Sequence, residues 1–408
     1  MPQDRLLNAL DTHIDRLESD GTAKGEELIV VEVIAPQEDR GPRIVLEGFE
    51  DRQFMRFNSN SYLGLSLLDE IVEAEEEGSR RFGVGPGAVR FISGSYSAHR
   101  DLEDRLARFH DRESGIVFSS AYAAVLGSLG PLITKDTAVI SDELNHNCII
   151  NAIRLARPAE KVVYPHLDLE SLDRSLQELE GKARRALVVT DGIFSMRGDH
   201  APLDRIMELA RSHDHRYPEN VAVVVDDSHG VGAFGARGRG VEELTGSAPV
   251  DVLIGTLGKA FGVNGGYVVG SRRLTRFLRE SAPTYIYSNP ITPGEAMACT
   301  AALDLVDSAR GRELLDRLRT LTRYFEKGLA QVGIETIPGE HPVVPLMIRD
   351  TARTQALVRH LFDHDVLVTG LTYPVVPRGD EEIRTQINAD HTMGDLDRVL
   401  EILDAFDG

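Results

Sequence analysis

Residues 221–230 read VAVVVDDSHG, and residues 251–270 read DVLIGTLGKAFGVNGGYVVG. Each stretch begins with a short, uninterrupted apolar run and then breaks into polar residues and glycines. Such runs are typical of strands that are buried on both faces, as in a parallel sheet covered by helices. Because ligands of such sheets collect beyond the carboxyl ends of the strands, the polar residues after each run are the first candidates for a site.

The alternation of apolar runs and helical segments extends outward from these stretches, beginning near residue 100. We predict strands at Ile116–Ser119, Ala138–Ser141, Val162–Tyr164, Ala186–Thr190, Val221–Asp226, Val252–Gly255 and Tyr267–Gly270. We predict helices at Ala121–Leu132, Cys148–Ala156, Leu169–Glu180 and Leu203–His213. Strands that alternate with helices predict an α/β domain with a mainly parallel sheet. Tyr267–Gly270 follows its neighbour too closely for a helical crossover, so we expect that strand to be antiparallel.

The pattern divides the chain into three parts. Residues 1–55 form an N-terminal segment with a polar amphipathic helix at about 3–19 and a β-like stretch at 28–34. Residues 56–290 form the large α/β domain, and residues 291–408 form a smaller α+β lobe. The lobe's expected elements are a helical stretch at 293–333, strands at Val343–Ile348, Val366–Thr369 and Glu382–Ile387, and helices at Thr351–His364 and Met393–Phe406. We expect a hinge between domain and lobe at Pro283–Pro293.

Composition limits the class of protein. The chain has 408 residues, of which 42% are hydrophobic and 27% charged, so general disorder is not expected. Its 65 acidic and 45 basic residues give a formal net charge of −20, which argues against binding to nucleic acid or to a membrane surface. No stretch reaches the ~18 apolar residues of a membrane helix, and the acidic start has no signal-peptide pattern. Cys148 and Cys299 lie in apolar contexts without metal-type spacing, so we expect a reducing, cytoplasmic location.

The first candidate site follows the strand at 221–226. Asp226 at the end of this strand would hold either a protonated ring nitrogen or a metal, and His229 would face the same ligand. The alternative is a helix cap or a turn of solvated acids. The sequence His213-Asp214-His215 precedes RYPEN, so we expect a solvated loop there rather than a metal site.

The second candidate site follows the strand at 252–255. Lys259 is one of six lysines, and its surroundings are apolar and rich in glycine. A partly desolvated lysine has a lowered pKa and forms Schiff bases, whereas the alternative is an exposed turn lysine. The Walker phosphate loop is not met, because Ala260 follows the lysine. Together with Asp226 and Thr256, Lys259 suits pyridoxal phosphate (PLP), which needs a lysine, a carboxylate and phosphate ligands.

Seven stretches carry a resemblance to a known family: NSYLGLS (60–66), GVGPGAVRFISGS (83–95), SDELNHNCII (141–150), TDGIFSMRGD (190–199), VDDSHGVGAFGARGRG (225–240), GTLGKAFG (255–262) and IRTQINADHT (383–392). The chain resembles the α-oxoamine synthases, which are PLP-dependent acyltransferases of fold type I, the aspartate-aminotransferase type. The resemblance implies that fold, with a seven-stranded sheet. Within the family, YIYSNPITP (285–293) and YPVVPRGDEEIRTQ (373–386) are most similar to the glycine C-acetyltransferase branch, also called 2-amino-3-ketobutyrate CoA ligase.

The resemblance implies roles at the cofactor ring. Lys259 would hold the cofactor aldehyde and later move the α-proton of the substrate. Asp226 would pair with the pyridinium nitrogen, and His229 would reach the phenolic oxygen. His146 would stack on the ring, although its position before the helix at 148–156 alone favours a capping residue. Ser195 would line the same pocket, and its alternative is an ordinary turn serine.

The resemblance also implies phosphate ligands and a second subunit. Ala121 and Tyr122 would bind the phosphate through backbone N–H groups at a helix start, and Thr256 would add a hydroxyl. Glycine or cysteine is common in the family where Ala121 stands, but backbone contacts survive that change. Ser288 and Asn289 would reach the cofactor of a neighbouring subunit, which implies a homodimer with shared sites.

At the substrate end, Arg384 would clamp the amino-acid carboxylate, a role that suits a planar guanidinium. By composition alone, Arg384 would instead be one more surface ion pair. Asn60 would also contact substrate. Ser61 stands where asparagine or aspartate is common in the family, so this end of the pocket departs from the usual pattern.

The implied reaction joins an amino acid, which we expect to be glycine, to an acyl-CoA, which we expect to be acetyl-CoA. The products would be a 2-amino-3-oxo acid and free CoA. Three alternatives stay open: another α-oxoamine synthase (8-amino-7-oxononanoate, 5-aminolevulinate or serine palmitoyl type), an aminotransferase on the same fold, and a noncatalytic binding protein.

Overall fold

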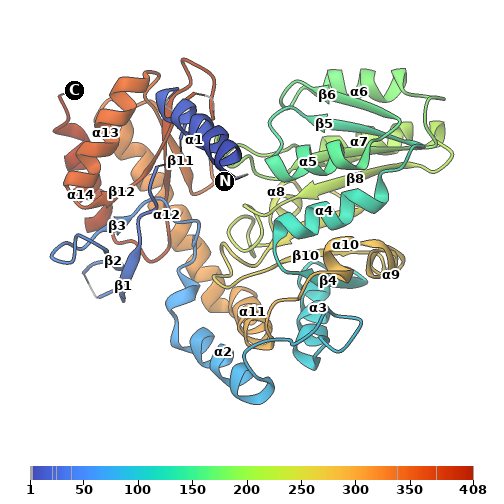
Figure 1. Cartoon of the computed structure of the whole chain (residues 1–408), viewed down its shortest axis with the longest axis horizontal. Helices are drawn as coiled ribbons and strands as arrows, with labels where there is room; N and C mark the ends of the chain where they lie inside the picture. The colour runs from blue at the N-terminus through green and yellow to red at the C-terminus, as the bar shows by residue number, and fades with distance from the viewer. Residues whose placement is uncertain are drawn as a thin grey trace.

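The computed structural model describes residues 3–407, apart from residues 21, 24, 38, 338 and 374. A seven-stranded sheet has the strand order β4-β10-β9-β8-β7-β5-β6 (Figure 1). Its strands are β4 (Ser114–Phe118), β5 (Thr137–Asp142), β6 (Glu160–Tyr164), β7 (Arg185–Asp191), β8 (Val221–Asp226), β9 (Val252–Thr256) and β10 (Gly266–Gly270). In this sheet β10 runs antiparallel to its neighbours β4 and β9, and the other pairs are parallel. The predicted sheet and its antiparallel strand are confirmed.

Helices cover both faces of this sheet, which explains why its strands read as continuous apolar runs. One face carries α4 (Ala121–Leu132), α5 (Asn147–Ala156), α9 (Arg272–Ser281) and α10 (Pro283–Ile286). The other face carries α3 (Ser97–Phe109), α6 (Leu169–Glu178), α7 (Leu203–His213) and α11 (Pro293–Val306). Along β7, Leu187 and Val189 pack on the first of these faces, whereas Ala186 and Val188 pack on the second. With both faces covered, polar side chains gather at the strand ends.

The long helix α12 (Ala309–Gln331) leads into a smaller lobe, orange to red in Figure 1. This lobe contains an antiparallel sheet of β11 (Val343–Met347), β14 (Glu382–Gln386) and β13 (Thr369–Leu371), in that order, together with α13 (Thr351–Asp363) and α14 (Met393–Asp404). Arg384 lies on the central strand, opposite Pro345 and Thr369. The α+β character of the lobe is confirmed, whereas the boundaries at 55 and 290 and the hinge at Pro283–Pro293 stay predictions.

The N-terminal segment consists of α1 (Asp4–Ser19), the antiparallel pair β1 (Val30–Ile34) and β2 (Arg43–Leu46), and β3 (Met55–Arg56). β3 pairs in parallel with β12 (Val366–Leu367), so this segment lies against the C-terminal lobe (Figure 1). The prediction of a single strand at Val366–Thr369 is therefore wrong. The backbone divides at Val368 between β12 and β13, which belong to different sheets. The partner of β12 is remote in the chain, so the local pattern does not reveal this division.

Other parts of the chain also differ from the prediction. The sequence did not predict α2 (Asp69–Phe82), α3, α8 (Val241–Thr245) or α9. His213 does not lie on a solvated loop, because it ends α7, is buried and places Nε2 2.6 Å from Oδ1 of Asp173. A carboxylate on the neighbouring helix thus allows the imidazole to be buried. Among the helices of the described residues, none has the length and apolar character needed to span a bilayer.

Candidate active site

A pocket lies at the carboxyl edge of the seven-stranded sheet, beside the ends of β7 and β8 and the start of α4. Its lining consists of Ala121, Tyr122, His146, Cys148, Asp191, Ile193, Ser195, Asp226, Ser228, His229 and Lys259. Of the predicted site residues, the structure brings Ala121, Tyr122, His146, Ser195, Asp226, His229 and Lys259 together here. The lining of this pocket in the described chain does not include the predicted residues Asn60, Thr256, Ser288, Asn289 and Arg384.

Lys259 lies in the loop that follows β9. The backbone N–H of Gly262 donates to the carbonyl of Lys259 at 2.9 Å, which closes the loop into a turn. Burial lowers the pKa of the Lys259 amine, and the neighbouring carboxylates of Asp226 and Asp191 oppose this shift only in part. A lowered pKa increases the fraction of neutral amine, which is the nucleophilic form.

Asp226 ends β8 and is 7% exposed. Its Oδ1 atom accepts hydrogen bonds from the backbone N–H of Ser228 at 3.1 Å and from the Ser228 hydroxyl at 2.5 Å. The thiol of Cys148 lies 3.6 Å from the other oxygen, Oδ2. The next acid, Asp227, is fully buried and accepts the backbone N–H of Val241 at 2.8 Å. The two consecutive acids therefore have different roles, because Asp226 faces the pocket whereas Asp227 holds the following loop.

His229 is held by the N-terminal part of the large domain. Its Nδ1 atom lies 2.7 Å from the hydroxyl of Tyr62, and that hydroxyl lies 3.3 Å from Oδ1 of Asn60. Burial, followed by the positive charge of Lys259, lowers the pKa of His229 well below its usual value. The imidazole is therefore neutral at physiological pH and has a hydrogen-bonding role rather than a cationic one. Asn60 connects to this pocket through Tyr62.

His146 both lines the pocket and caps α5. Its Nδ1 atom accepts the backbone N–H of Cys148 at 3.3 Å. His146 is therefore a helix cap, as its position before the helix suggested, and it lines the pocket as well. The backbone N–H of His146 donates to Oδ2 of Asp191 at 3.0 Å. His146 as a whole residue is exposed, although burial within the pocket still lowers the pKa of its imidazole. A flat aromatic ring at a pocket mouth can cover one face of a bound aromatic ligand.

The start of α4 provides an anion-binding end to the pocket. The N-cap residue Ser120 accepts the backbone N–H of Ala123 at 3.1 Å. The N–H groups of the first helical residues have no partner inside a helix, and the helix dipole favours negative charge there. Gly266 permits the close packing of β10 on this turn, because a Cβ at that position would lie 2.3 Å from the backbone nitrogen of Ala121. The first turn of α4 therefore suits a phosphate group.

The residues of the pocket fit PLP. An amine, a carboxylate and a helix N-terminus lie along one pocket, as the aldehyde, the ring nitrogen and the phosphate require. Oδ1 of Asp191 is buried there without a hydrogen-bond partner among the described residues. Thr256 stands at the end of β9, where its hydroxyl lies 3.3 Å from the carbonyl of Gly265 and 3.2 Å from the N–H of Gly258.

Arg384 approaches the pocket from the small lobe. Its NH1 group donates to the carbonyl of Ser195 at 3.3 Å. In the amide orientation that satisfies both side chains, Oε1 of Gln386 accepts from Nε of Arg384 at 2.6 Å. Two acceptors therefore orient the guanidinium beside the pocket wall. Ser288 and Asn289 follow α10, and Asn289 is exposed.

Sequence reasoning missed Asp191, Cys148, Ile193 and Ser228 in the lining of the pocket. For Asp191 a signal was present, because VVTD at 188–191 ends in an acid in the same way as VVVD at 223–226. The criterion that selected Asp226, an acid at the carboxyl end of a buried strand, applies equally to Asp191. The contact of Tyr62 with His229 had no such signal, because it joins remote parts of the chain.

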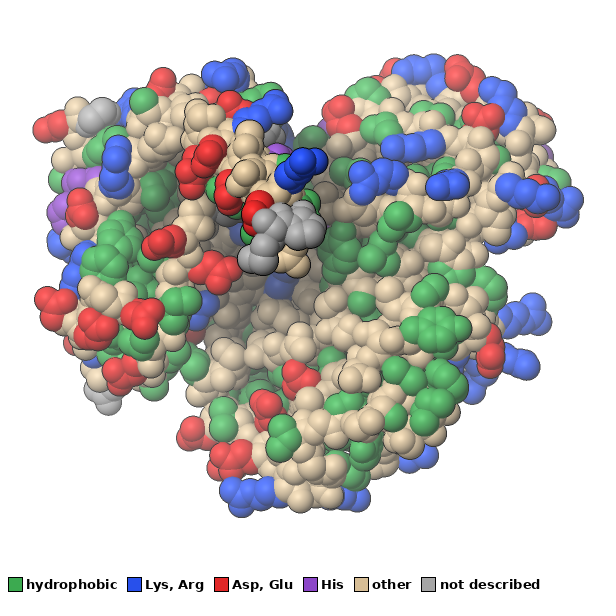
Figure 2. All heavy atoms as spheres, viewed as in Figure 1, with side chains coloured by type: hydrophobic (Ala, Val, Ile, Leu, Met, Phe, Trp, Pro, Cys, Tyr) green, Lys and Arg blue, Asp and Glu red, His purple; other side chains and the backbone are tan. Residues whose placement is uncertain are grey.

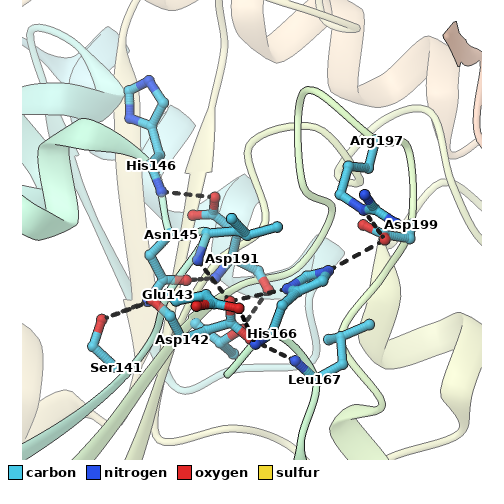
Figure 3. Close-up of polar contacts among 12 residues, drawn as sticks. Ser141, Asp142, Glu143, Asn145, His146, His166, Leu167, Asp191, Arg197 and Asp199 are labelled. Atoms are coloured by element: carbon cyan, nitrogen blue, oxygen red, sulfur yellow. Dashed lines mark hydrogen bonds and ion pairs between the residues drawn. The ribbon is translucent and has the colours of Figure 1, made fainter. Parts of the chain in front are cut away.

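Behind the pocket lies a second group of charges, which we name the His166 cluster: Asp142, His166, Arg197 and Asp199. Nδ1 of His166 lies 3.0 Å from Asp142, and Nε2 lies 3.2 Å from Asp199 (Figure 3). Arg197 donates to the same oxygen of Asp199 at 2.8 Å. Burial alone would lower the pKa of His166, but the two carboxylates raise it to about 9. The cluster joins the end of β5 to the segment that carries Ser195.

Comparison with known proteins identifies the family. The class I and II aminotransferase family matches residues 52–403. The chain is 37% identical over 363 residues to the 8-amino-7-oxononanoate synthase of Thermosipho melanesiensis, covering 89% of this chain and 90% of that protein. It is also 37% identical over 399 residues to the mitochondrial 2-amino-3-ketobutyrate coenzyme A ligase of Bos taurus, covering 97% of this chain and 91% of that protein. The chain belongs to the α-oxoamine synthase family.

Solved structures of this α-oxoamine synthase family share the fold. A serine palmitoyltransferase of Sphingomonas wittichii matches with a TM-score of 0.87 and 26% identity, covering 99% of this chain and 96% of that chain. A structure of SPT with a PLP internal aldimine matches with a TM-score of 0.86 and 26% identity, covering 99% and 97%. The expected fold type I architecture and the cofactor are therefore confirmed. This α-oxoamine synthase is a PLP-dependent acyltransferase that condenses an amino acid with an acyl-CoA.

Proposed function

We propose that this α-oxoamine synthase condenses glycine with acetyl-CoA to give 2-amino-3-ketobutyrate and free CoA. The observation that carries the reaction type is the placement of Lys259, Asp226 and His229 around one pocket. The choice of substrates rests on the sequence. The stretches at 285–293 and 373–386 resemble the glycine C-acetyltransferase branch, and the bovine ligase matches 97% of the chain. Within the second stretch, Pro374 lies outside the described residues.

Bound PLP supplies an electron sink that stabilises negative charge on the substrate Cα. Lys259 would hold the cofactor aldehyde and would accept the α-proton of the substrate on its Nζ atom. Its lowered pKa suits both roles, because both need a neutral amine. Asp226 would keep a proton on the ring nitrogen, and the two hydrogen bonds from Ser228 fix the carboxylate for that purpose.

The remaining residues would orient the reactants. Arg384 would bind the amino-acid carboxylate with two parallel N–H donors, which fixes the direction of the Cα–H bond. His229, neutral and tied to Tyr62, would hydrogen-bond the phenolic oxygen of the ring. His146 would cover the open face of the ring and exclude water from it. Thr256 and the N–H groups of Ala121 and Tyr122 would hold the phosphate.

We further propose a homodimer. Figure 2 shows hydrophobic side chains beside the central hollow. On α4, on α5 and after α10, the described chain exposes the large hydrophobic residues Tyr122, Ile150, Leu155 and Tyr287. Exposed apolar groups in such number favour a covered interface. Ser288 and Asn289 would then reach the partner's cofactor. Light scattering of the holoenzyme tests the dimer, since a monomer at micromolar concentration would contradict it.

Both cysteines are buried and free, which supports a reducing, cytoplasmic location.

A second candidate is 8-amino-7-oxononanoate synthesis, because the synthase of Thermosipho melanesiensis matches at the same 37% identity as the bovine ligase. Release of CoA thiol, measured with glycine, alanine and serine against acetyl-CoA and longer acyl-CoAs, decides between them. Glycine with acetyl-CoA is expected to have the highest kcat/KM, with the Lys259→Ala variant as the inactive control. A preference for alanine with a long dicarboxylic acyl chain would favour the second candidate. Amino transfer to 2-oxoglutarate without thiol release would instead indicate an aminotransferase.

A further inference from the structure

Two carboxylic acids end neighbouring strands beside Lys259. Asp191 is the last residue of β7, and it pairs in register with Asp226, the last residue of β8. Both line the pocket, and they are 5% and 7% exposed. The proposed function uses Asp226 alone. Two ionised carboxylates this close repel each other in a low-dielectric site, so the pair favours one negative charge rather than two.

The hydrogen bonds of the two acids differ. Asp226 receives two donors from Ser228 on one oxygen and has the Cys148 thiol near the other. Asp191 receives one donor, the backbone N–H of His146, on Oδ2. Its Oδ1 atom is buried and has no partner among the described residues. Donors stabilise an ionised carboxylate, so the negative charge of the pair belongs on Asp226 and the proton on Oδ1 of Asp191.

The surroundings of Asp191 point to the same arrangement. Burial, and next the charge of Asp226, raise the pKa of Asp191 well above its usual value, although the His146 N–H and Lys259 oppose this. Asp142, at the end of the next strand β5, adds further negative charge. A neutral carboxylic acid keeps one oxygen as an acceptor and turns the other into a donor.

Asp191 is also part of a rigid clamp on the loop that carries His146. The backbone N–H of Asp191 donates to Oδ1 of Asn145 at 2.8 Å, and the amide of Asn145 donates to the carbonyl of Val189 at 2.8 Å and to the hydroxyl of Ser141 at 2.9 Å. Figure 3 shows the Asp191 carboxyl directed at the backbone nitrogen of His146. The end of β7 thus fixes the backbone from which the His146 side chain extends.

We infer that Asp191 is a positioning residue of this site and acts as a neutral carboxylic acid. Its Oδ2 atom fixes the backbone of His146, and its protonated Oδ1 atom donates a hydrogen bond to the bound cofactor or substrate. The negative charge of the pair stays on Asp226. This inference rests on the proposed function, because it deepens the same pocket.

The test compares Asp191→Asn with Asp191→Ala. Asparagine copies a neutral carboxylic acid, since it keeps one acceptor and one donor in the same shape, whereas alanine has neither. We expect Asp191→Asn to bind PLP within about threefold of the wild type and to keep the position of the visible absorption band. We expect Asp191→Ala to bind PLP about tenfold more weakly, with a shifted band, because a hydrogen bond in a buried polar site is lost.

Asp168→Asn is the matched control, because Asp168 caps α6 by accepting the backbone N–H of Ser171 at 3.0 Å and does not line the pocket. It should lower Tm and leave the absorption band in place. If Asp191→Asn binds PLP as weakly as Asp191→Ala and shifts the absorption band as far, the carboxylate charge is needed and the inference is overturned. If both variants lower Tm but keep cofactor affinity and the band, Asp191 is only structural, which also overturns it. These PLP titrations contain no acyl-CoA. Failure of the wild type to release thiol would therefore reject the proposed function but would leave the PLP affinities of the Asp191 variants unchanged.

Discussion

In the His166 cluster both ring nitrogens of the histidine have carboxylate partners. The pocket lies at the same edge of the same sheet, but its Lys259 and its buried Asp191 have no ion pairs within the described chain. The pKa values diverge accordingly. Burial acts on both His166 and His229, but the carboxylates raise the pKa of His166 to about 9, whereas the positive charge of Lys259 adds to the effect of burial at His229, whose pKa is lowered.

The contrast separates a structural cluster from a binding site. A buried charge that has its partners is stable in the folded chain, and the His166 cluster needs no ligand. Groups that lose solvent without gaining partners shift toward their neutral forms and cost stability until a ligand supplies the missing contacts. Lys259 and Asp191 meet the second description, which is why the candidate active site lies beside the ends of β7 and β8 rather than at the end of β5.

Removing the pocket amine should have the largest effect. Lys259→Ala is expected to lower kcat by about 10³-fold or more, because the variant loses both the cofactor linkage and the proton acceptor. Its Tm without cofactor should equal or exceed that of the wild type, since an amine whose pKa is lowered by burial opposes folding. Thiol release and thermal melting check both points. Lys327→Ala, an exposed lysine on α12, is the control. Residual activity near the wild-type level would refute the role of Lys259.

Replacing the guanidinium should have the next largest effect. Arg384→Lys keeps the charge but loses the planar pair of donors, so the KM for glycine should rise roughly 10-fold or more while kcat changes less. Initial rates at varied glycine measure this split. Arg398→Lys on α14 is the exposed control and should behave as the wild type. An unchanged KM would mean that Arg384 does not hold the carboxylate.

In the His166 cluster the effect should appear in stability. The folded pKa of His166 is about 9 against 6.5 for the free side chain. Its stabilisation is therefore fully present below pH ~6.5 and is lost as the pH rises through about 9. His166→Gln should lower the free energy of unfolding by about 1–3 kcal/mol at pH 6 and by much less at pH 10. Urea unfolding at both pH values checks this, and an equal loss at both would contradict it.

Glu382, near Arg384 on β14, is a buried acid for which we expect a smaller effect on stability. Burial raises its pKa to about 7, although Arg197 and Arg384 oppose this, and its Oε1 has no partner among the described residues. The folded chain thus prefers the protonated acid, and stability falls as the pH rises from about 4.5 to 7. Glu382→Gln should stabilise the chain by about 1 kcal/mol at pH 8 and by nothing at pH 4. Its neighbour Glu381, whose pKa is lowered by backbone donors, should show the opposite trend when changed to Gln.

The sheet and much of its cofactor pocket could be predicted because both depend on local pattern. The strand at 221–226 and the helices at 121–132 and 203–213 are found at the predicted bounds. Contacts between remote segments could not be predicted, as β12 with β3 and Tyr62 with His229 show. Asp191 could have been found, but its role depends on a strand neighbour that only the folded sheet provides.

Lys259 is expected to bind the cofactor aldehyde at the sheet edge, beside Asp226. Reduction of the PLP-loaded enzyme with borohydride, followed by peptide mass spectrometry, tests it most directly. One stable pyridoxyl adduct per chain is expected, on the peptide that contains Lys259, and it should be absent in Lys259→Ala. An adduct on another lysine such as Lys161 or Lys327, or no adduct at saturating PLP, would contradict this claim.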